Sequence, residues 1–438
     1  MAKRKQKESL TLEEKLEAAL VPEDEQPYEV PGNWCWIKLE AISQIKTGKK
    51  DANYGSDNGQ YYFFTCASEP IRCDNYSFEG KSILLAGNGD IGNISIYDGK
   101  FEAYQRTYVL SVIEPLLYQY VYYFLKYRWV DYNIDKMFGT AIPYIRLGNL
   151  QQFPVPISPL SEQKRIVERI ERLFSQLDEA RDKAQEALEE SESRITSILH
   201  QAFTGALTVK QRREKGLSTS SWKEVSLKEI VQGFKYGTSE KSDYNYSGMP
   251  VLRIPNIGED GIVFSDMKYL SDNNVDEENQ IHENDILIIR SNGSRDLVGK
   301  CALIPKLDKK YAYASFLIRI KPTNKVRSDY LVLFLNSVDA RTQMFAKAKS
   351  SAGIHNINTK ELGVITLKLP QLWEQEVIVN LVGHLLLEEK QVKEAAEQVI
   401  EQIASTKKAI LSKAFRGELG TNDPEDESAI DLLKRHLS

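Results

Sequence analysis

The sequence reads PLSEQKRIV at residues 159–167 and PQLWEQEVIV at residues 370–379. The shared leucine, Glu-Gln pair and Ile-Val pair align with an offset of 212 residues. The same offset relates ILHQAFTGAL at residues 198–207 to ILSKAFRGEL at residues 410–419. A repeat at one fixed spacing indicates that a single structural unit occurs twice in the chain.

A long helix is predicted between the two ends of each repeat. Apolar and small residues advance there by alternating steps of four and three, which is the heptad pattern of a coiled coil. In the first copy they are Ile166, Ile170, Leu173, Leu177, Ala180, Ala184, Ala187, Ile195, Ile198 and Ala202. In the second copy they are Ile378, Val382, Leu385, Val392, Ala396, Val399, Ile403, Ile410 and Ala414. Polar residues interrupt the two series at Ser191 and Glu389.

The ends of these helices carry typical signals. We expect Ser161 to be the N-cap, Glu162 to suit the positive helix end, and Gly205 and Gly417 to occupy the C′ position. A helix over residues 161–203 would be about 65 Å long at about 1.5 Å per residue. Small alanines on the seam would let two such helices approach closely. Because the chain enters and leaves two globular units, we expect the helices to pair antiparallel, with one unit at each end. The alternative, that each helix packs only on its own domain, stays open.

A globular unit is predicted upstream of each helix. Residues 33–113 contain short β-rich runs separated by turn dipeptides, followed by a helix over about 116–137. The second unit follows the same plan, with a helix over about 328–348. A weaker repeat with an offset of 188 aligns Trp34 with Trp222. The sequence therefore predicts an α/β (α+β) chain of two tandem units, separated by two long helices and related by a pseudo-two-fold repeat.

Composition favours an ordinary globular protein of 438 residues, 42% hydrophobic and 27% charged. No apolar run approaches the roughly 18 residues of a membrane span. The basic N-terminus precedes an acidic segment and a short helix expected over residues 10–20, which is not a secretory signal. Four cysteines without a C-x-x-C pair and five scattered histidines favour no metal site. We expect a cytoplasmic protein that does not associate with membranes.

The net charge of −5 is unevenly distributed. Residues 371–438 hold 8 Lys and Arg against 13 Asp and Glu, whereas residues 222–370 hold 21 against 18. A surface without an overall basic excess predicts weak non-specific binding to nucleic acid by the isolated chain.

Common catalytic motifs are missing from the sequence. Neither NPPY nor DPPY, the signature of amino-methylating DNA methyltransferases, occurs in it. Residues 293–300 imitate a phosphate loop, but five residues separate the glycines and Cys301 follows the lysine. We interpret this stretch as a turn between strands. The histidines have no evident acid or nucleophile partner. His355, on a loop predicted over residues 352–356, is the one that we would place at a DNA surface.

The repeated stretches resemble the two conserved regions of specificity subunits of type I restriction-modification systems, and the resemblance covers essentially the whole chain. It implies two target-recognition domains, each reading one half of a bipartite sequence in double-stranded DNA. The conserved helices would separate the domains and dock two methyltransferase subunits. One departure is that Trp373 and Glu376 replace Ser161 and Lys164, so the two methyltransferase contacts need not be identical.

The resemblance also implies what the chain lacks. It would be a non-catalytic subunit with no cofactor or metal of its own. S-adenosylmethionine would be held by the methyltransferases, which would methylate adenine N6. Restriction (translocase) subunits would add ATP, Mg²⁺ and cleavage. The expected segments are an N-terminal helix and linker (1–27), recognition domain 1 (28–160), spacer helix 1 (161–207), a linker (208–221), recognition domain 2 (222–370), spacer helix 2 (371–419) and a C-terminal tail (420–438).

Candidate DNA-contacting residues combine side chains that can read base edges or bind phosphate with positions at strand ends or turns. In the first unit they are Lys46, Lys49, Lys50, Asn88, Gln105, Arg106, Thr140, Tyr144 and Arg146. In the second unit they are Lys235, Lys241, Arg253, Asn256, Arg290, Ser291, Asn292, Ser294, Arg295, Ser350, Ser351, His355 and Asn356. For each single residue a solvated surface role is the alternative. The tyrosines between 118 and 127 are at helical spacing, so we expect them in the core.

Two other functional classes are alternatives to this interpretation. A coiled-coil scaffold could bind protein partners without reading DNA, and a stand-alone methyltransferase or nuclease would need motifs that this sequence lacks. A neighbouring methyltransferase gene would favour the specificity subunit.

Overall fold

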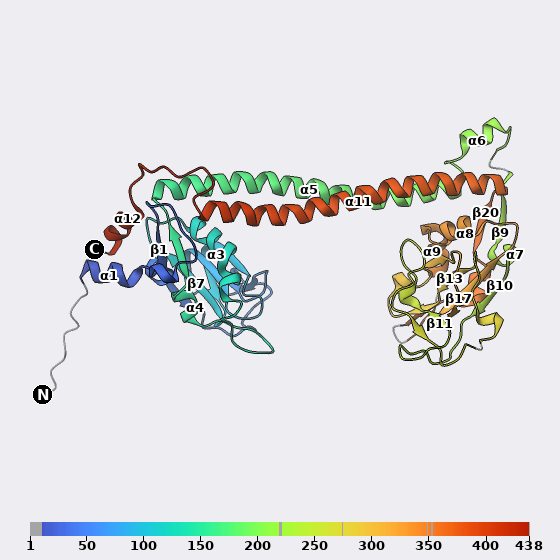
Figure 1. The fold of residues 1–438 in the computed structure, drawn as a ribbon, viewed down its shortest axis with the longest axis horizontal. Helices are drawn as coiled ribbons and strands as arrows, with labels where there is room; N and C mark the ends of the chain where they lie inside the picture. The colour runs from blue at the N-terminus through green and yellow to red at the C-terminus, as the bar shows by residue number, and fades with distance from the viewer. Residues whose placement is uncertain (1–10, 219–220, 274, 348, 352–353, 438) are drawn as a thin grey trace. The chain divides into compact units, whose positions relative to one another are not determined.

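The computed structural model describes residues 11–218, 221–273, 275–347, 349–351 and 354–437. For residues 347, 349–351 and 354 it describes the backbone alone. The chain divides into two compact units (Figure 1). Unit 1 contains residues 1–183 and 398–438, and unit 2 contains residues 184–397. Each long helix therefore contributes one half to each unit.

Unit 1 is built on a six-stranded sheet with the order β2-β7-β5-β6-β3-β4, in which β3 and β6 are parallel and the other neighbours antiparallel. A separate antiparallel pair joins β1 to β8. The strands are β1 (Cys35–Lys38), β2 (Ser43–Thr47), β3 (Tyr61–Phe64), β4 (Ile71–Cys73), β5 (Phe78–Ala86), β6 (Ile94–Ala103), β7 (Thr107–Val112) and β8 (Pro154–Ile157).

Unit 1 contains further helical elements besides the two long helices. They are α1 (Leu12–Ala19), the 3-10 turn η1 (Glu23–Glu25), α2 (Leu39–Ile42), α3 (Tyr118–Asn133), α4 (Leu147–Gln151) and α12 (Ala429–Leu437). Thr11 and Glu14 form a capping box at the start of α1. Tyr120 of α3 is fully buried, and Tyr118, Tyr122, Tyr123 and Tyr127 pack against the same core, as expected from their spacing.

Unit 2 distributes its strands over four small sheets. Their orders are β10-β17-β13-β15, β12-β11-β16, β14-β19-β18 and β20-β9. The strands are β9 (Lys223–Ser226), β10 (Val231–Tyr236), β11 (Pro250–Leu252), β12 (Lys268–Tyr269), β13 (Ile286–Ile289), β14 (Ser291–Asn292), β15 (Cys301–Leu303), β16 (Ala312–Tyr313), β17 (Leu317–Pro322), β18 (Lys349–Ser351), β19 (Ile354–Asn356) and β20 (Thr366–Leu369).

The helices of unit 2 depart from the expectation in one place. They are α6 (Val209–Glu214), α7 (Leu227–Ile230), η3 (Ile254–Asn256), η4 (Glu277–Asn279), η5 (Arg295–Leu297), α8 (Ser328–Leu335), α9 (Val338–Lys347) and α10 (Thr359–Gly363). The prediction of a single helix over 328–348 is wrong, because the helix is interrupted between α8 and α9. There the Asn336 side chain pairs with both backbone groups of Cys301 and so links the helix end to β15.

The long helices are α5 (Leu160–Thr204) and α11 (Leu372–Phe415). They pair antiparallel, as predicted. In unit 1 Asp178 forms an ion pair with Lys407 (2.7 Å). In unit 2 Arg194 forms an ion pair with Glu389 (2.8 Å). No helix within the described part of the chain is long and apolar enough to cross a membrane.

The polar residues Ser191 and Glu389, which interrupt the heptad pattern, face each other in unit 2. Ser191 is buried on the seam, and its hydroxyl donates to the backbone carbonyl of Glu389 (3.4 Å). The Glu389 carboxylate then reaches Arg194. A polar position within an apolar seam fixes the register of a coiled coil. The contact between Ser191 and Glu389 is such a position in this helix pair.

Each end of the helix pair is closed by a buried glutamate. In unit 1 Glu162 accepts a hydrogen bond from Thr421 (2.7 Å), which follows α11. In unit 2 the equivalent Glu374 accepts hydrogen bonds from Thr208 (2.7 Å), which follows α5, and from Arg212 (2.6 Å). The start of each long helix is thus tied to the chain that leaves the other helix. The expectation that Ser161 is an N-cap was wrong, because α5 already begins at Leu160.

The glutamines of the repeat serve the neighbouring helices. Gln163 accepts a hydrogen bond from the backbone N–H of Leu117 (3.2 Å), the N-cap of α3. Gln375 accepts one from the N–H of Arg327 (2.8 Å), the N-cap of α8. Both glutamines are fully buried. Each therefore satisfies an N–H at a helix start that would otherwise lack a partner.

Candidate nucleic-acid interface

Three chain segments of unit 1 meet where β5 ends. Gly87 donates its N–H to the carbonyl of Arg106 (2.8 Å) and accepts from the N–H of Ile145 (2.9 Å). Asn88 forms a β-bridge with Tyr144. A Cβ on Gly87 would lie 2.3 Å from the Arg106 carbonyl oxygen, so this close approach requires glycine. The sequence predicted these segments as candidates, and the structure joins them.

An exposed loop projects beside this junction. Phe138 and Tyr144 exchange two backbone hydrogen bonds (2.9 and 2.8 Å), so the intervening residues form a tip that carries Thr140. The guanidinium of Arg146 lies 3.9 Å from the ring centroid of Phe138, and that of Arg106 lies 5.8 Å from the ring centroid of Tyr144. The loop thus presents cations that are held by aromatic rings.

The remaining candidates of unit 1 flank the same strands. Lys50 forms a bridge with Tyr104, and its carbonyl accepts from the N–H of Gln105 (2.9 Å). The Gln105 side chain already donates to Asp51 (3.0 Å). Exposed Lys46 and Lys49 line a separate hollow that also contains Glu102. The N–H of Gly48 donates to the Thr107 carbonyl (3.2 Å), so the backbone at Lys49 runs beside the 105–107 segment of the junction, while both lysine side chains line this hollow.

Unit 2 repeats this junction with different side chains. Arg290 follows β13, donates its N–H to the Phe316 carbonyl (3.0 Å) and accepts from the N–H of Ile357 (2.9 Å). It takes the position that Gly87 holds in unit 1. Ser291 pairs with Asn356, and Asn292 pairs with His355, in the sheet β14-β19-β18. We expected this last segment to be a loop, which was wrong: β19 is the central strand of that small sheet.

The Arg290 guanidinium is held from several sides. Its Nε donates to the Asn356 side chain (3.3 Å), its Nη1 donates to the Ser315 carbonyl (3.4 Å), and its Cζ lies 4.6 Å from the ring centroid of Tyr236. Asn292 accepts from the N–H of Ser294 (2.8 Å), which shapes the turn predicted in place of a phosphate loop. A half-buried arginine held by a ring and two oxygens is pre-positioned for planar recognition of a base edge.

Asn256 has no free group for DNA, which corrects its assignment. It is 1% exposed, and its side-chain nitrogen donates to the carbonyls of Val263 and Ser265 (both 2.9 Å). Its side-chain oxygen accepts from the N–H of Arg253 (2.8 Å). Asn256 therefore shapes its own loop. Arg253, whose N–H binds Asn256, forms an ion pair with Asp266 (3.0 Å).

The other basic candidates of unit 2 differ in their surroundings. Lys235 is exposed on β10 and forms an ion pair with Glu278, while Lys241 is exposed beyond that strand. Arg295 lies over the ring of Phe345, 4.8 Å from its centroid. The side chains of Ser350 and Ser351 lie outside the described residues.

Burial sets the charge state of groups behind the junction in unit 2. It raises the pKa of Tyr313 to about 12, so the phenol stays neutral and donates to the carbonyl of Lys235 (3.3 Å). Burial also raises the pKa of Asp285, against the lowering effect of the Arg319 charge. In the neighbouring loop, the Tyr244 hydroxyl and Arg253 hold the pKa of Asp266 below its usual value.

Several aromatic residues at these positions were missed. The ring of Tyr236 contacts the guanidinium of Arg290, and the ring of Phe138 contacts that of Arg146. Phe316 is 58% exposed in the turn before β17. Aromatic residues in β-rich segments are ordinarily core residues, so their types gave no signal. Their proximity to arginine depends on contacts between distant segments. Among the described residues, no cluster of His, Cys, Asp and Glu could hold a metal ion.

These geometries define a class of protein, a duplicated α+β chain with one polar, arginine-bearing strand-end junction in each unit. The family model of the type I restriction modification DNA specificity domain matches residues 31–190 and 219–402. The chain therefore belongs to this family, whose members are the non-catalytic DNA-recognition components of type I restriction-modification systems.

Curated relatives and solved structures agree with this assignment. The EcoDI specificity subunit of Escherichia coli is 27% identical over 89% of this chain and 89% of its own length. The MjaVIII specificity subunit of Methanocaldococcus jannaschii is 24% identical over 89% of this chain and 94% of its own length. A chain solved in work on complex assembly of the type I R-M system shares the fold with a TM-score of 0.70, at 19% identity, over 90% of this chain and 100% of that one.

The HsdS subunit of Thermoanaerobacter tengcongensis also has this fold, with a TM-score of 0.54 at 18% identity, over 90% of this chain and 100% of its own. At such identities the structural likeness concerns the fold alone.

Proposed function

We propose that this chain reads a bipartite target in double-stranded DNA, with one unit per half-site. One observation carries the proposal: each unit joins the end of its central strand to the same two partner segments through equivalent backbone hydrogen bonds. Gly87 does so in unit 1 and Arg290 in unit 2. Equivalent scaffolds that carry unlike side chains suit two recognition sites that read different bases.

The candidate residues fall into two roles within this proposal. Arg106, Tyr144 and Arg146 in unit 1, with Arg290 and Asn292 in unit 2, would read bases, because they sit at the junctions. The lysines at positions 46, 49, 50, 235 and 241, all exposed except the half-buried Lys50, would contact phosphates and add affinity without specificity.

We infer the partner subunits of this chain, and the reactions that they catalyse, from its family. Two methyltransferase subunits would dock on the paired helices and supply S-adenosylmethionine for adenine N6 methylation. Restriction subunits would add ATP-dependent, Mg²⁺-dependent translocation and cleavage. The paired helices would set the separation of the two half-sites. The recognition domains would span residues 28–160 and 222–370, and the spacer helices residues 161–207 and 371–419.

A selection experiment tests the recognition claim. The chain is reconstituted with a methyltransferase subunit of a type I restriction-modification system, and bound duplexes are selected from a random library. The proposal expects two short specific blocks at a fixed separation. Selection of no sequence, or of duplexes that the methyltransferase alone also enriches, would favour a coiled-coil scaffold without DNA readout.

A further inference from the structure

Equivalent strands at one end of the two units differ in how they are covered. β1 follows Trp34, β9 follows Trp222, and each pairs antiparallel with the strand before a long helix. In β1 every residue except Lys38 is buried. In β9 no residue is buried, and its first two residues are exposed. The first strand of the pair is therefore covered in unit 1 and uncovered in unit 2.

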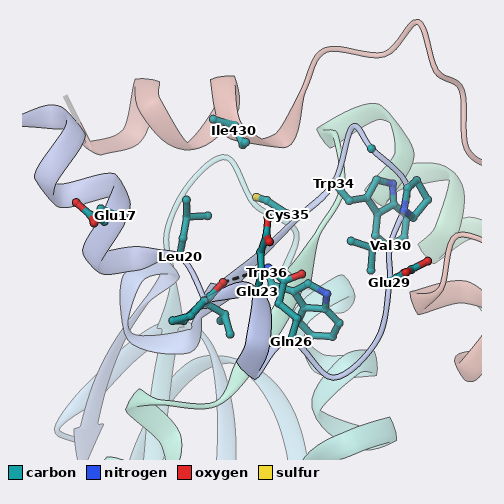
Figure 2. A pocket seen from close by; sticks show the side chains of 14 residues that line it. Glu17, Leu20, Glu23, Gln26, Glu29, Val30, Trp34, Cys35, Trp36 and Ile430 are labelled. Carbon is teal, nitrogen blue, oxygen red and sulfur yellow. Dashed lines mark hydrogen bonds between the residues drawn. The ribbon is translucent and has the colours of Figure 1, made fainter.

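In unit 1 the chain's own N-terminal arm, residues 12–25, covers β1. Leu20 forms an antiparallel bridge with Ile37, and the N–H of Val21 donates to the carbonyl of Trp36 (3.1 Å). Helix α12 packs against α1 of this arm and buries three apolar residues in the same core. Figure 2 shows side chains of the arm, β1 and α12 lining one hollow. The arm thus extends the β1-β8 pair by a strand-like segment.

In unit 2 the outer edge of β9 has no such cover. The N–H of Leu227 donates to the carbonyl of Ile365 (2.9 Å), and Val225 pairs with Leu367. Because alternate residues of an antiparallel strand face opposite sides, the N–H and carbonyl of Glu224 point away from β20. Within the described residues, no backbone group pairs with this outer edge.

Apolar side chains remain beside this open edge. Leu372 is 49% exposed, whereas the equivalent Leu160 packs against the core of unit 1. Leu369 is half-buried, whereas the equivalent Ile157 is fully buried. A groove of about 850 Å³ results, whose lining includes Lys223, Val225, Ile230, Lys325, Leu369 and Leu372. Apolar surface beside an unpaired strand edge is typical of a protein-binding site.

Charge distinguishes what this groove would accept. Lys223 and Lys325 are exposed on its rim, Glu229 is the one acid that lines it, and Glu224 is exposed beside it on β9. The arm that covers the equivalent edge in unit 1 carries Glu13, Glu14 and Glu17 on α1. An acidic arm with apolar residues at its extended end is complementary both to the rim and to the groove.

We propose that β9 binds an acidic segment of a partner protein, which adds as an antiparallel strand and fills the groove with adjacent apolar side chains. The segment is equivalent in chemistry to Leu20-Val21 and the helix before it. This inference rests on the proposed function only in requiring a protein partner in the complex. It does not depend on DNA readout.

A peptide of residues 11–27 of this chain provides the probe. In the full-length chain the arm already occupies β1, so a fluorescein-labelled peptide finds the β9 edge open. We expect saturable binding of one peptide per chain by fluorescence anisotropy. Hydrogen-exchange mass spectrometry should show slower exchange in the segment 221–227. A lack of saturable binding, or unchanged exchange there, would overturn the proposal.

Two variants and a matched control locate the binding. Glu224→Pro removes the outward N–H at an edge position, where proline is tolerated, and should abolish binding. Leu372→Glu should weaken binding about ten-fold by placing a charge in the apolar groove. As the control, Val364→Glu changes another exposed apolar residue, which is 46% exposed and does not line the groove, and it should have no effect. Equal binding by all variants would contradict the proposal.

Self-association provides a separate outcome. If sedimentation shows a dimer of the chain that Glu224→Pro dissociates, the groove binds a second copy, and the assignment to a partner protein is wrong. A complex that selects no DNA sequence but still binds the peptide would overturn the proposed function alone.

Discussion

Arg290 is the residue whose surroundings most directly suggest base recognition. Replacing it with alanine should relax one half of the target and leave the other unchanged, because a bidentate base contact contributes about 1–3 kcal/mol of discrimination. Selection of bound duplexes by the variant complex measures this. Arg327→Ala is the matched control, since Arg327 pairs with Asp329 outside the junction. Equal loss of information at both halves would instead indicate a phosphate or folding effect.

Glu374 is the residue whose burial most directly holds the helix ends together. It is 1% exposed, accepts from Arg212 (2.6 Å), and receives the indole N–H of Trp222 (2.9 Å). Glu374→Ala should lower the free energy of unfolding by about 3–5 kcal/mol, because it leaves a buried arginine uncompensated. Chemical denaturation measures this. Exposed Glu376→Ala should have little effect, and similar losses in both variants would contradict the role of burial.

Sequence alone could predict which residue types reach the surface but not which of them are already occupied. Asn256 has the same amide as Asn292, yet its hydrogen bonds go to Val263 and Ser265 in its own loop. Glu162 was expected at a positive helix end, an ordinary place for an acid on the surface. Its burial depends on Thr421, which is 259 residues away. Such pairings are set by tertiary contacts and leave no local pattern.

The long helices were predictable because a heptad pattern repeats over many turns and each repeat adds to the signal. The sequence predicts α8 and α9 as one helix, because the apolar spacing continues from one to the other. The interruption between them depends on the contact of Asn336 with Cys301. The strand β19 was taken for a loop because its polar residues and neighbouring glycine are typical of turns. Short strands that pair only with short, distant strands carry no periodicity to detect.

Helix length should set the spacing of the target. Removing residues 181–187 and 393–399 deletes one heptad from each helix and keeps the seam in phase. It shortens each helix by about 10.5 Å at about 1.5 Å per residue. At about 3.4 Å per base pair, the non-specific gap should shrink by roughly three base pairs with both half-sites intact. Selection of bound duplexes by the deleted complex measures the gap.

A deletion out of phase serves as the control for this experiment. Removing three or four residues from one helix should misalign the seam, including the facing pair Ser191 and Glu389, and prevent assembly with the methyltransferase. A heptad-deleted chain that assembles and selects the original gap would mean that the helices do not set the spacing.

At the scale of the whole molecule, charge predicts a dependence on partners. The chain has a net charge of −5, so without a partner it should bind DNA weakly. Mobility shifts with the purified chain and then with the reconstituted complex measure this. Tight, sequence-specific binding by the isolated chain at moderate salt would contradict the expectation.

The central claim is that each unit reads its own half of the target, and a map of methylated adenines tests it most directly. Modified sites are mapped in hosts that carry the wild-type gene, no gene, or a gene in which residues 222–370 come from a relative with a different target. The account predicts two blocks with a fixed gap, absent without the gene, of which the exchange alters only one. Methylation that does not depend on the gene, or an exchange that alters both blocks together, would contradict it.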